Sequence, residues 1–204
     1  MAELLFKPGQ FVSVKHVIDG REITRAYSIA SQPGGNRFAL CLNRIENGLV
    51  SKYLFELEAG AEIEMGEALG YFTLRNPQRD ALFVATGTGV APFRSMLLQH
   101  LPEVQRQITL LMGCRYPQGL MYREELNQLA QAHPHFSFVP TVTRPDESWS
   151  GRTGRVQAHL DEVLGERRDL DVYTCGLKEM VDDVRSLLKQ KGFDRKQIIY
   201  EKYD

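Results

Sequence analysis

Apolar and polar positions follow one pattern in residues 1–75 and a different pattern in the rest of the chain. In residues 1–75 they alternate within short segments that are separated by turn residues, which is typical of antiparallel strands. Three such segments are 11–14, 37–44 and 62–65. In the second of them, Phe38, Leu40 and Leu42 fall on one face of the expected strand. We therefore predict that the first part of the chain forms a small antiparallel β-barrel.

In the second part of the chain, apolar runs of strand length alternate with amphipathic segments of helix length. The predicted strands are 81–85, 108–112, 136–141 and 172–175. A predicted helix over 177–191 carries one apolar stripe and ends at Gly192. The stripe consists of Met180, Val181, Val184, Leu187 and Leu188. This alternation indicates an open parallel α/β sheet, so we predict two domains, 1–76 and 80–204, with the polar segment 76–80 as the linker.

Composition and charge serve only to exclude some kinds of partner and of binding site. The chain has 204 residues, no apolar run of transmembrane length and a formal net charge of −1, so we expect neither nucleic acid nor a membrane as a partner. No signal-peptide pattern begins at Met1, which favours a soluble cytoplasmic protein. The cysteines, Cys41, Cys114 and Cys175, form no C-x-x-C pair, and the histidines show no metal-ligand spacing. We therefore expect no metal site, no iron–sulfur cluster and no disulfide framework.

The most informative segment is Thr86-Gly87-Thr88-Gly89, which stands between the apolar run 81–85 and a helical pattern over 93–99. Glycines in such a turn let the backbone approach phosphate oxygens, and the helix that follows favours negative charge at its amino terminus. The segment lacks the third glycine of the G-x-G-x-x-G fingerprint. Taken alone, it is therefore either a diphosphate-binding turn or only a tight strand–helix connection.

A second candidate motif lies upstream, at Arg25-Ala26-Tyr27-Ser28, and is followed by Gly48-Leu49-Val50-Ser51. The first segment offers an arginine for phosphate, an aromatic face for a flat ring, and a hydroxyl for ring heteroatoms. The second offers a helix start that suits another phosphate. Without further support, the arginine–tyrosine pair fits an ordinary strand with one exposed face better than a binding site.

The order of these motifs resembles the ferredoxin–NADP reductase family of flavoproteins, and above all its bacterial members, which share the R-A-Y-S-I-A-S run found at 25–31. Further segments match the family in the same order along nearly the whole chain. They are 66–74, 113–116, 122–126, 143–145, 149–156, 173–176 and 201–203. The resemblance implies a flavin-binding β-barrel followed by an α/β domain that binds a nicotinamide nucleotide.

The resemblance also implies roles for the residues of the first motif pair. Arg25 would contact the flavin diphosphate, Tyr27 would stack on the isoalloxazine ring, and Ser28 would hydrogen-bond near flavin N5. Ala26 belongs to the same binding strand. Gly48, Leu49, Val50 and Ser51 would hold the diphosphate through backbone amides and the Ser51 hydroxyl. A segment that holds a diphosphate implies FAD rather than FMN.

For the second domain, the resemblance implies an NADP site. Thr86, Gly87, Thr88 and Gly89 would hold the nucleotide diphosphate. Cys175 and Gly176 would border the nicotinamide ring. Arg144, helped by Arg115 or Arg155, would meet the 2′-phosphate of the adenosine. The residues expected nearest to the chemistry are Ser28, Cys175 and Tyr203.

The implied activity is that of a ferredoxin–NADP reductase-like oxidoreductase. It passes a hydride between NADPH and FAD, and single electrons between FAD and ferredoxin or flavodoxin, which are small acidic carriers. One alternative is the NADH-dependent reductase component of an oxygenase. Another is a flavin-binding subunit of a larger electron-transfer complex.

Both ends of the chain depart from the family pattern. The F-x-P-G-Q segment stands at 6–10, whereas family members usually carry another barrel strand before it, so we expect a barrel that lacks its first strand and has an unpaired edge. Dimerisation through that edge and truncation of a longer product both stay open. At the other end Asp204 replaces an aromatic residue, so Tyr203 or Tyr200 would have to cover the flavin unless 198–200 is simply a last buried strand.

Overall fold

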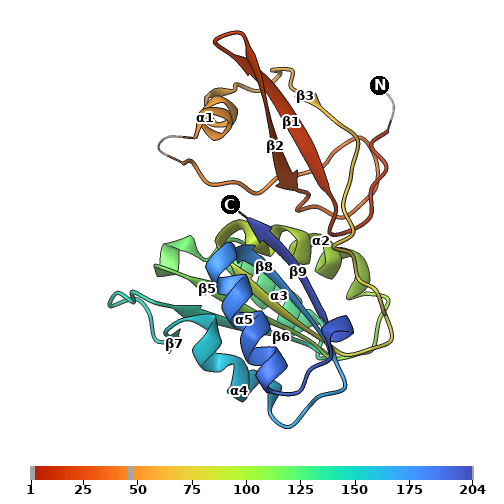
Figure 1. The fold of residues 1–204 in the computed structure, drawn as a ribbon, viewed down its shortest axis with the longest axis vertical. Helices are drawn as coiled ribbons and strands as arrows, with labels where there is room; N and C mark the ends of the chain where they lie inside the picture. Colours follow the sequence, from red (N-terminus) through yellow and green to blue (C-terminus); the bar gives the residue numbers. More distant parts are fainter. Residues whose placement is uncertain (1–2, 46–47, 204) are drawn as a thin grey trace. The chain divides into compact units, whose positions relative to one another are not determined.

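The computed structural model describes residues 3–45 and 48–203. Met1 and Asp204, on which two of the expectations rest, lie outside the described residues. The chain divides into two compact units, each with its own sheet (Figure 1). Unit 1 contains the chain up to Leu74 together with Ala91–Gln99, and unit 2 contains Arg75–Val90 and the chain from His100 onward. The domain limits 1–76 and 80–204 stay a prediction.

Unit 1 is built on an antiparallel sheet with the strand order β2-β1-β3. Strand β1 (Phe11–Ile18) pairs along its whole length with β2 (Arg21–Ser28), and the short β3 (Glu64–Met65) pairs with the other side of β1. The hairpin turn consists of Asp19 and Gly20, whose φ angles of 50° and 73° are both positive. Asp-Gly turns with this geometry match the natural twist of a hairpin, which explains the long regular pairing of β1 with β2.

The predicted strand over 37–44 is wrong. The structure has a single bridge there, between Ile29 and Leu40, and Phe38, Leu40 and Leu42 are only partly buried. Alternating apolar residues form a strand when a neighbour pairs with them over several residues. This segment meets its neighbour only near Ile29, so its backbone stays irregular.

Helix α2 (Val90–His100) contributes most of its length to unit 1. The ring of Phe93 packs edge-on against Phe72, with 5.6 Å between the ring centroids. The Ser95 hydroxyl donates a hydrogen bond of 2.6 Å to the Ser31 carbonyl. Because Phe72, Phe93 and Ser95 are buried, α2 is part of the core of unit 1 as well as the continuation of the glycine-rich turn.

Unit 2 is built on a fully parallel sheet with the strand order β7-β6-β5-β4-β8-β9. Its strands are β4 (Ala81–Thr86), β5 (Ile108–Cys114), β6 (Phe136–Val142), β7 (Arg152–Thr153), β8 (Asp171–Leu177) and β9 (Ile198–Tyr203). All four predicted strands are confirmed, and each is longer than its apolar run. The parallel α/β fold of the second part of the chain is therefore confirmed.

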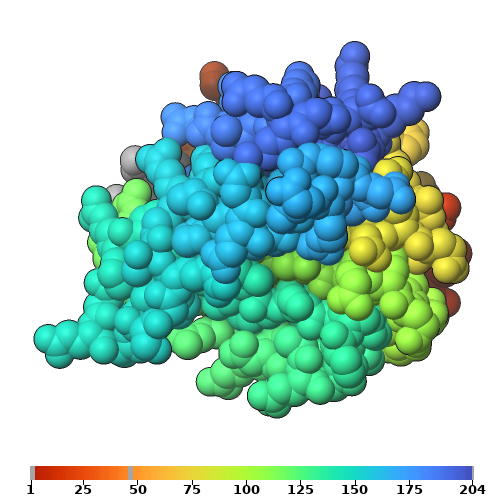
Figure 2. Space-filling view, turned by 90° about the horizontal axis from the view of Figure 1, so that it is seen from below, coloured from red at the N-terminus to blue at the C-terminus, as the bar shows by residue number. Residues whose placement is uncertain are grey.

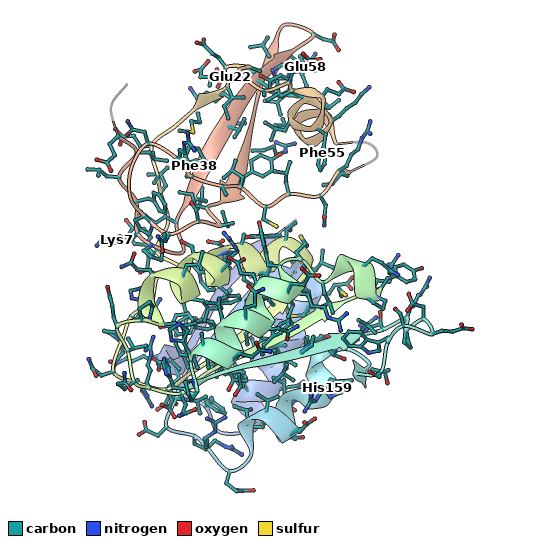
Figure 3. All side chains as sticks on the ribbon, turned by 180° about the vertical axis from the view of Figure 1, so that it is seen from behind. Lys7, Glu22, Phe38, Phe55, Glu58 and His159 are labelled. Atoms are coloured by element: carbon teal, nitrogen blue, oxygen red, sulfur yellow. The ribbon has the colours of Figure 1, made fainter. Side chains whose placement is uncertain are left out.

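Helices cover both faces of this sheet. Helix α3 (Arg123–Ala132) lies on one face, and α4 (Leu160–Leu164) with α5 (Lys178–Gln190) lies on the other (Figures 1 and 3). Short 3₁₀ turns join the elements: η1 (Gly87–Gly89), η2 (Pro117–Gly119), η3 (Val156–His159) and η4 (Arg195–Gln197). In residues 3–45 and 48–203, no helix combines the length and the apolar character needed to cross a bilayer.

Helix α5 follows the predicted pattern. The stripe residues Met180, Val181, Val184 and Leu188 are buried, and Leu187 is partly buried against the same core. Gly192, with a φ of 84°, follows the last turn in the left-handed region that favours glycine. The predicted helix over 177–191 is therefore confirmed to within a residue at each end.

Candidate nucleotide and flavin sites

The Thr86–Gly89 segment begins at the carboxyl end of β4. Thr86 is the last residue of the strand, Gly87–Gly89 forms η1, and α2 begins at Val90. Gly87 has a φ of 55°, and no heavy atom lies within 4 Å of the position that a β-carbon would occupy. A left-handed residue with open space on its side-chain position suits the close approach of a ligand to the backbone.

Gly89 packs against the end of β8. A β-carbon on Gly89 would lie 2.6 Å from the carbonyl carbon of Cys175 and 2.8 Å from the Cα of Gly176. A β-carbon on Gly176, whose φ is 140°, would lie 2.9 Å from the carbonyl oxygen of Thr86. The turn after β4 and the end of β8 thus pack backbone against backbone, and both glycines are needed for this contact.

This contact lies at the point where the strand order of the sheet reverses. From β4 the chain winds outward through β5 and β6, and it then returns to the other side of β4 with β8 and β9. Open α/β sheets bind ligands in the crevice beyond the carboxyl ends of the strands at such a switch point. The hydroxyl oxygen of Thr86 is buried there and has no hydrogen-bond partner among the described residues. An unsatisfied hydroxyl beside an open glycine turn fits a phosphate-bearing ligand.

Cys175 is buried at the carboxyl end of β8. Burial raises the pKa of its thiol well above the usual value, the Glu201 carboxylate adds to the increase, and a hydrogen bond with Tyr203 opposes it. A protonated, buried thiol is a poor nucleophile. Cys175 is therefore suited to packing and alignment rather than to covalent chemistry.

Tyr200 and Tyr203, one of which was expected to cover the flavin, have different surroundings in β9. Ile198 and Ile199 are buried in β9, as expected for a last buried strand, whereas Tyr200 is 44% exposed. The Arg185 guanidinium lies 3.6 Å from the centroid of the Tyr200 ring, which is a cation–π contact with α5. Tyr203 instead forms a hydrogen bond with Cys175. Of the two tyrosines it is therefore the better candidate for a site residue.

Two of the three arginines expected at the 2′-phosphate are neighbours. The amide of Arg144 donates a hydrogen bond of 2.8 Å to the carbonyl of Arg115, and its guanidinium donates one of 3.2 Å to the Tyr116 hydroxyl. Arg144 belongs to an exposed segment after β6 that projects from the surface (turquoise in Figures 1 and 2). Within the described residues, no carboxylate lies within 4.0 Å of the guanidinium of Arg115, Arg144 or Arg155. All three charges are therefore available to an anionic ligand.

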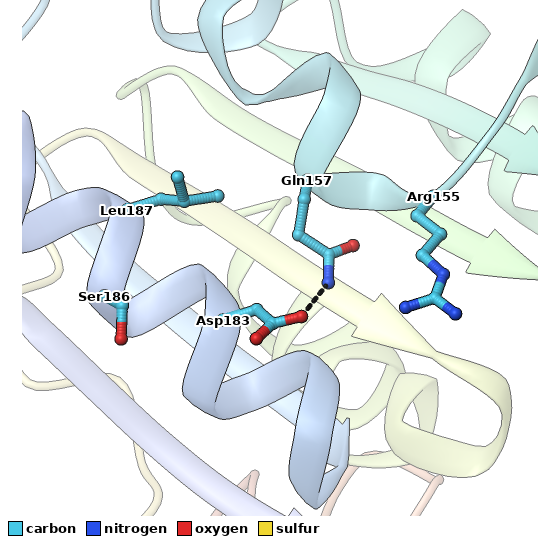
Figure 4. A pocket seen from close by; sticks show the side chains of 5 residues that line it. All are labelled: Arg155, Gln157, Asp183, Ser186 and Leu187. Carbon is cyan, nitrogen blue, oxygen red and sulfur yellow. Dashed lines mark hydrogen bonds between the residues drawn. The ribbon is translucent and has the colours of Figure 1, made fainter.

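Arg155 stands apart from this pair, beside a hollow of about 340 Å³ between η3 and α5 (Figure 4). The hollow is lined by Arg155, Gln157, Asp183, Ser186 and Leu187. The Gln157 side-chain amide donates a hydrogen bond of 3.0 Å to Asp183, and its buried oxygen has no partner among the described residues. The hollow therefore combines one cation, one carboxylate and one unsatisfied acceptor, which suits a polar ligand that carries both phosphate and donor groups.

Sequence reasoning missed the four residues that line the hollow with Arg155. Gln157 lies in a short 3₁₀ turn, and Asp183 and Ser186 occupy polar positions of an amphipathic helix. Such positions normally face water, and nothing in the sequence indicates that η3 faces this part of α5. The only usable signal is the proximity of Gln157 to Arg155 along the chain.

In unit 1, the end of β2 combines the expected aromatic and cationic groups. Arg25 and Tyr27 are two residues apart and share one face of the strand, while Ala26 and Ser28 share the other. Burial raises the pKa of the Tyr27 hydroxyl, and the Arg25 guanidinium opposes the increase. A half-buried ring beside an exposed arginine fits a flat aromatic ligand that carries phosphate.

The Gly48–Ser51 segment starts helix α1 (Leu49–Glu56), which contacts β2. The Ser51 hydroxyl donates to the Gly48 carbonyl at 3.2 Å and accepts the Ile45 amide at 3.3 Å, so it serves the local turn. The amides of Leu49 and Val50 belong to the first turn of the helix, which has no intrahelical acceptors for them. Phosphate binding here would depend on these amides rather than on the Ser51 hydroxyl.

Two family models match the chain in the order that the structure shows. Residues 1–74 match the oxidoreductase FAD-binding domain, and residues 83–186 match the oxidoreductase NAD-binding domain. The chain is 42% identical to ferredoxin–NADP reductase B of Sorangium cellulosum, a match that covers 98% of this chain and 86% of that protein. It is 29% identical to the toluate 1,2-dioxygenase electron transfer component of Pseudomonas putida, of which it covers 60%.

A solved structure supports the same relationship. The ferredoxin–NADP reductase of Neisseria gonorrhoeae, which contains bound FAD and NADP, superposes on this chain with a TM-score of 0.83 and 26% identity. The match covers 97% of this chain and 87% of that protein. Several other curated relatives are longer, and the chain spans only 52% to 60% of them.

Proposed function

Because this chain belongs to the ferredoxin–NADP reductase family of FAD- and NAD-binding oxidoreductases, we propose that it oxidises NADPH and passes single electrons to ferredoxin or flavodoxin. The observation that carries the proposal is the backbone contact between the Thr86–Gly89 turn and Cys175–Gly176 at the switch point of the sheet. A turn that only joined a strand to a helix would need neither the open left-handed glycine nor the unsatisfied Thr86 hydroxyl.

Unit 1 supplies the residues that would hold FAD. Tyr27 would provide the stacking face, Arg25 and the first-turn amides of α1 would provide the donors for the diphosphate, and Ser28 would lie at the ring edge. FAD, when bound, supplies the redox chemistry that couples a two-electron donor to one-electron acceptors. The task of the protein is then to orient the two cofactors and to exclude water.

Unit 2 supplies the residues that would hold NADPH. The Thr86–Gly89 turn would bind the diphosphate through its amides and the Thr86 hydroxyl. Cys175, held in its neutral form, would pack against the nicotinamide without exchanging a proton. Arg144 and Arg115 on one side and Arg155 at the hollow would offer cationic donors to the adenosine 2′-phosphate.

The likeness to the toluate 1,2-dioxygenase component supports a second candidate, an NADH-dependent reductase of an oxygenase. The two functions make different demands on the adenosine end of the nucleotide. Arg115, Arg144 and Arg155 make no ion pair within the described part of the chain and favour the additional phosphate of NADPH, whereas the Asp183 carboxylate at the hollow favours a free ribose hydroxyl. The intact turn after β4 argues against a subunit that binds only flavin.

Anaerobic reduction of the purified, FAD-reconstituted protein distinguishes these functions. We expect NADPH to bleach the flavin absorbance faster than NADH, and the reduced protein to reduce an added ferredoxin or flavodoxin. Faster bleaching by NADH, with electrons passed only to an oxygenase or its [2Fe–2S] protein, would establish the second candidate. Failure to bind any flavin would refute both.

Arg144→Ala is expected to raise the KM for NADPH by about ten- to a hundredfold and to leave the KM for NADH nearly unchanged. The reason is the loss of a charge-assisted hydrogen bond, worth about 1.5–3 kcal/mol, to a phosphate that NADH lacks. Steady-state kinetics with both nucleotides measure the effect. Arg195→Ala is the matched control, because this exposed arginine precedes β9 and so lies at the opposite edge of the sheet. Equal losses with both nucleotides would remove Arg144 from the phosphate site.

Cys175→Ser is expected to slow reduction of the flavin by NADPH about tenfold while the affinity for the nucleotide changes little. The smaller, more polar hydroxyl in a buried site shifts the surface against which the nicotinamide is aligned, and small misplacements strongly affect transfer rates. Anaerobic stopped-flow measurements of single turnovers give the rate. Cys114→Ser serves as the control, since Cys114 ends β5 rather than β8. An unchanged rate would mean that the ring lies elsewhere.

A further inference from the structure

The segment that carries Arg155 has little regular structure to hold it in place. Strand β7 consists of only Arg152 and Thr153, at the edge of the sheet. Gly154 follows with a φ of 108°, and Arg155 then leads into η3. Two residues of edge strand contribute few ladder hydrogen bonds, so the position of the turn depends on other contacts.

Thr141 provides the first of these contacts. It lies near the end of β6 and is fully buried, although it is polar. Its hydroxyl donates a hydrogen bond of 2.9 Å to the carbonyl oxygen of Gly154. The amide of Gly154 in turn donates one of 2.8 Å to the Val142 carbonyl. Both backbone polar groups of Gly154 are therefore bound to neighbouring residues of one strand.

His159 provides the second contact (Figure 3). Its Nε2 atom lies 3.0 Å from the Thr153 carbonyl oxygen and 3.1 Å from the Thr141 hydroxyl. Because the Thr141 hydrogen is already directed to Gly154, Nε2 must carry the hydrogen and donate to both oxygens. This arrangement requires a hydrogen on Nε2 of His159 and ties the residue before Gly154 to the buried threonine.

Glu162 secures the same segment from the outside. Its carboxylate accepts hydrogen bonds of 3.0 and 3.1 Å from the Arg152 Nε atom and a further one from the same guanidinium. It also lies 3.6 Å from Nδ1 of His159. Gly154 and the two residues before it, Arg152 and Thr153, are thus held by side chains from β6, η3 and α4.

We propose that Thr141 and His159 are positioning residues for nucleotide selectivity. By binding the carbonyl groups of Thr153 and Gly154, they hold the backbone that leads into Arg155 beside the hollow (Figure 4). The backbone at Arg155 is then ordered before the 2′-phosphate binds, so less conformational freedom is lost on binding. The inference rests on the proposed function, because it assumes that the adenosine end of NADPH binds at this hollow.

Binding of adenosine 2′,5′-bisphosphate and of adenosine 5′-monophosphate, measured by isothermal titration calorimetry with the FAD-loaded protein, tests the proposal without turnover. Thr141→Val keeps the shape of the side chain but removes the hydroxyl, and we expect it to weaken the bisphosphate about fivefold or more and the monophosphate less than twofold. Thr141→Ser, which keeps the hydroxyl, should bind both ligands like the wild type. Equal weakening of both ligands, or of neither, would overturn the positioning role.

A second pair of variants covers the case in which Thr141→Val does not fold. His159→Gln retains a donor nitrogen and should preserve the selectivity, whereas His159→Leu should lose it to the same extent as Thr141→Val. Arg155→Ala tests whether the hollow is the phosphate site separately from whether Thr141 and His159 position Arg155. If it does not weaken the bisphosphate, then the hollow is not the phosphate site and the positioning role falls with it, whereas the proposal that NADPH is the substrate is decided separately by Arg144→Ala and by flavin reduction. If Arg155→Ala weakens the bisphosphate selectively but the variants of Thr141 and His159 do not, only the positioning role is wrong.

Discussion

Gly89→Ala is expected to abolish tight binding of the nicotinamide nucleotide and to lower the thermal stability of unit 2. The new β-carbon would lie 2.6 Å from the Cys175 carbonyl carbon and 2.8 Å from the Gly176 Cα, and closer still to the Cys175 oxygen. All three atoms belong to the backbone, so no side chain can rotate away. The turn must therefore move off the end of β8, and overpacking of this kind costs about 1–3 kcal/mol.

Calorimetric titration with NADP and thermal unfolding measure the two effects. We expect the affinity for NADP to fall at least about a hundredfold, because the turn and the end of β8 no longer meet, while the FAD bound to unit 1 is retained. Gly119→Ala is the matched control, since its β-carbon would lie 3.6 Å from the nearest atom, an ordinary packing distance. Wild-type affinity and stability in Gly89→Ala would show that the turn does not bind at the switch point.

Tyr27→Ala is expected to produce protein that loses its flavin during purification. The change removes the stacking face and exposes the ligand ring, a combined loss of roughly 2–4 kcal/mol, or about thirtyfold or more in the dissociation constant for FAD. The ratio of absorbance at the flavin band to protein absorbance after desalting reports retention. Fluorescence titration of the apoprotein with FAD gives the affinity.

Two controls separate the ring of Tyr27 from its hydroxyl and from general effects of losing a tyrosine. Tyr27→Phe keeps the ring and should retain the flavin nearly as well as the wild type. Tyr71→Ala removes a tyrosine of the same unit that is 92% exposed, and it should have no effect. A Tyr27→Ala protein that remains fully yellow would place the flavin against another face of unit 1.

The sequence was sufficient to predict the elements whose stability is local or follows from burial on both faces. Strand β4 is an unbroken apolar run because both of its faces are covered, and α5 has a complete apolar stripe. Such patterns have one consistent interpretation. The segment 37–44 has the right alternation, but its structure depends on a partner strand that pairs with it at only one bridge, and alternation does not reveal the partner.

In the candidate site, too, the sequence revealed local features but not contacts between distant residues. The motifs around Tyr27 and Gly89 were visible because they combine special residues in short segments. The packing of Gly89 against Cys175 was not, because it joins residues 86 positions apart through the topology of the sheet. The hollow beside Arg155 was also invisible, since Gln157 and Asp183 come from different elements and resemble ordinary surface residues.

The buried thiol of Cys175 has a consequence for the durability of the protein in air. Reduced flavoproteins that meet oxygen release peroxide, which oxidises cysteine side chains. Peroxide attacks the thiolate rather than the thiol, and oxidation beyond the sulfenic acid is not readily reversed. Because burial raises the pKa of Cys175 well above the usual value, almost no thiolate exists at neutral pH. Oxidative damage is therefore not expected to begin at Cys175.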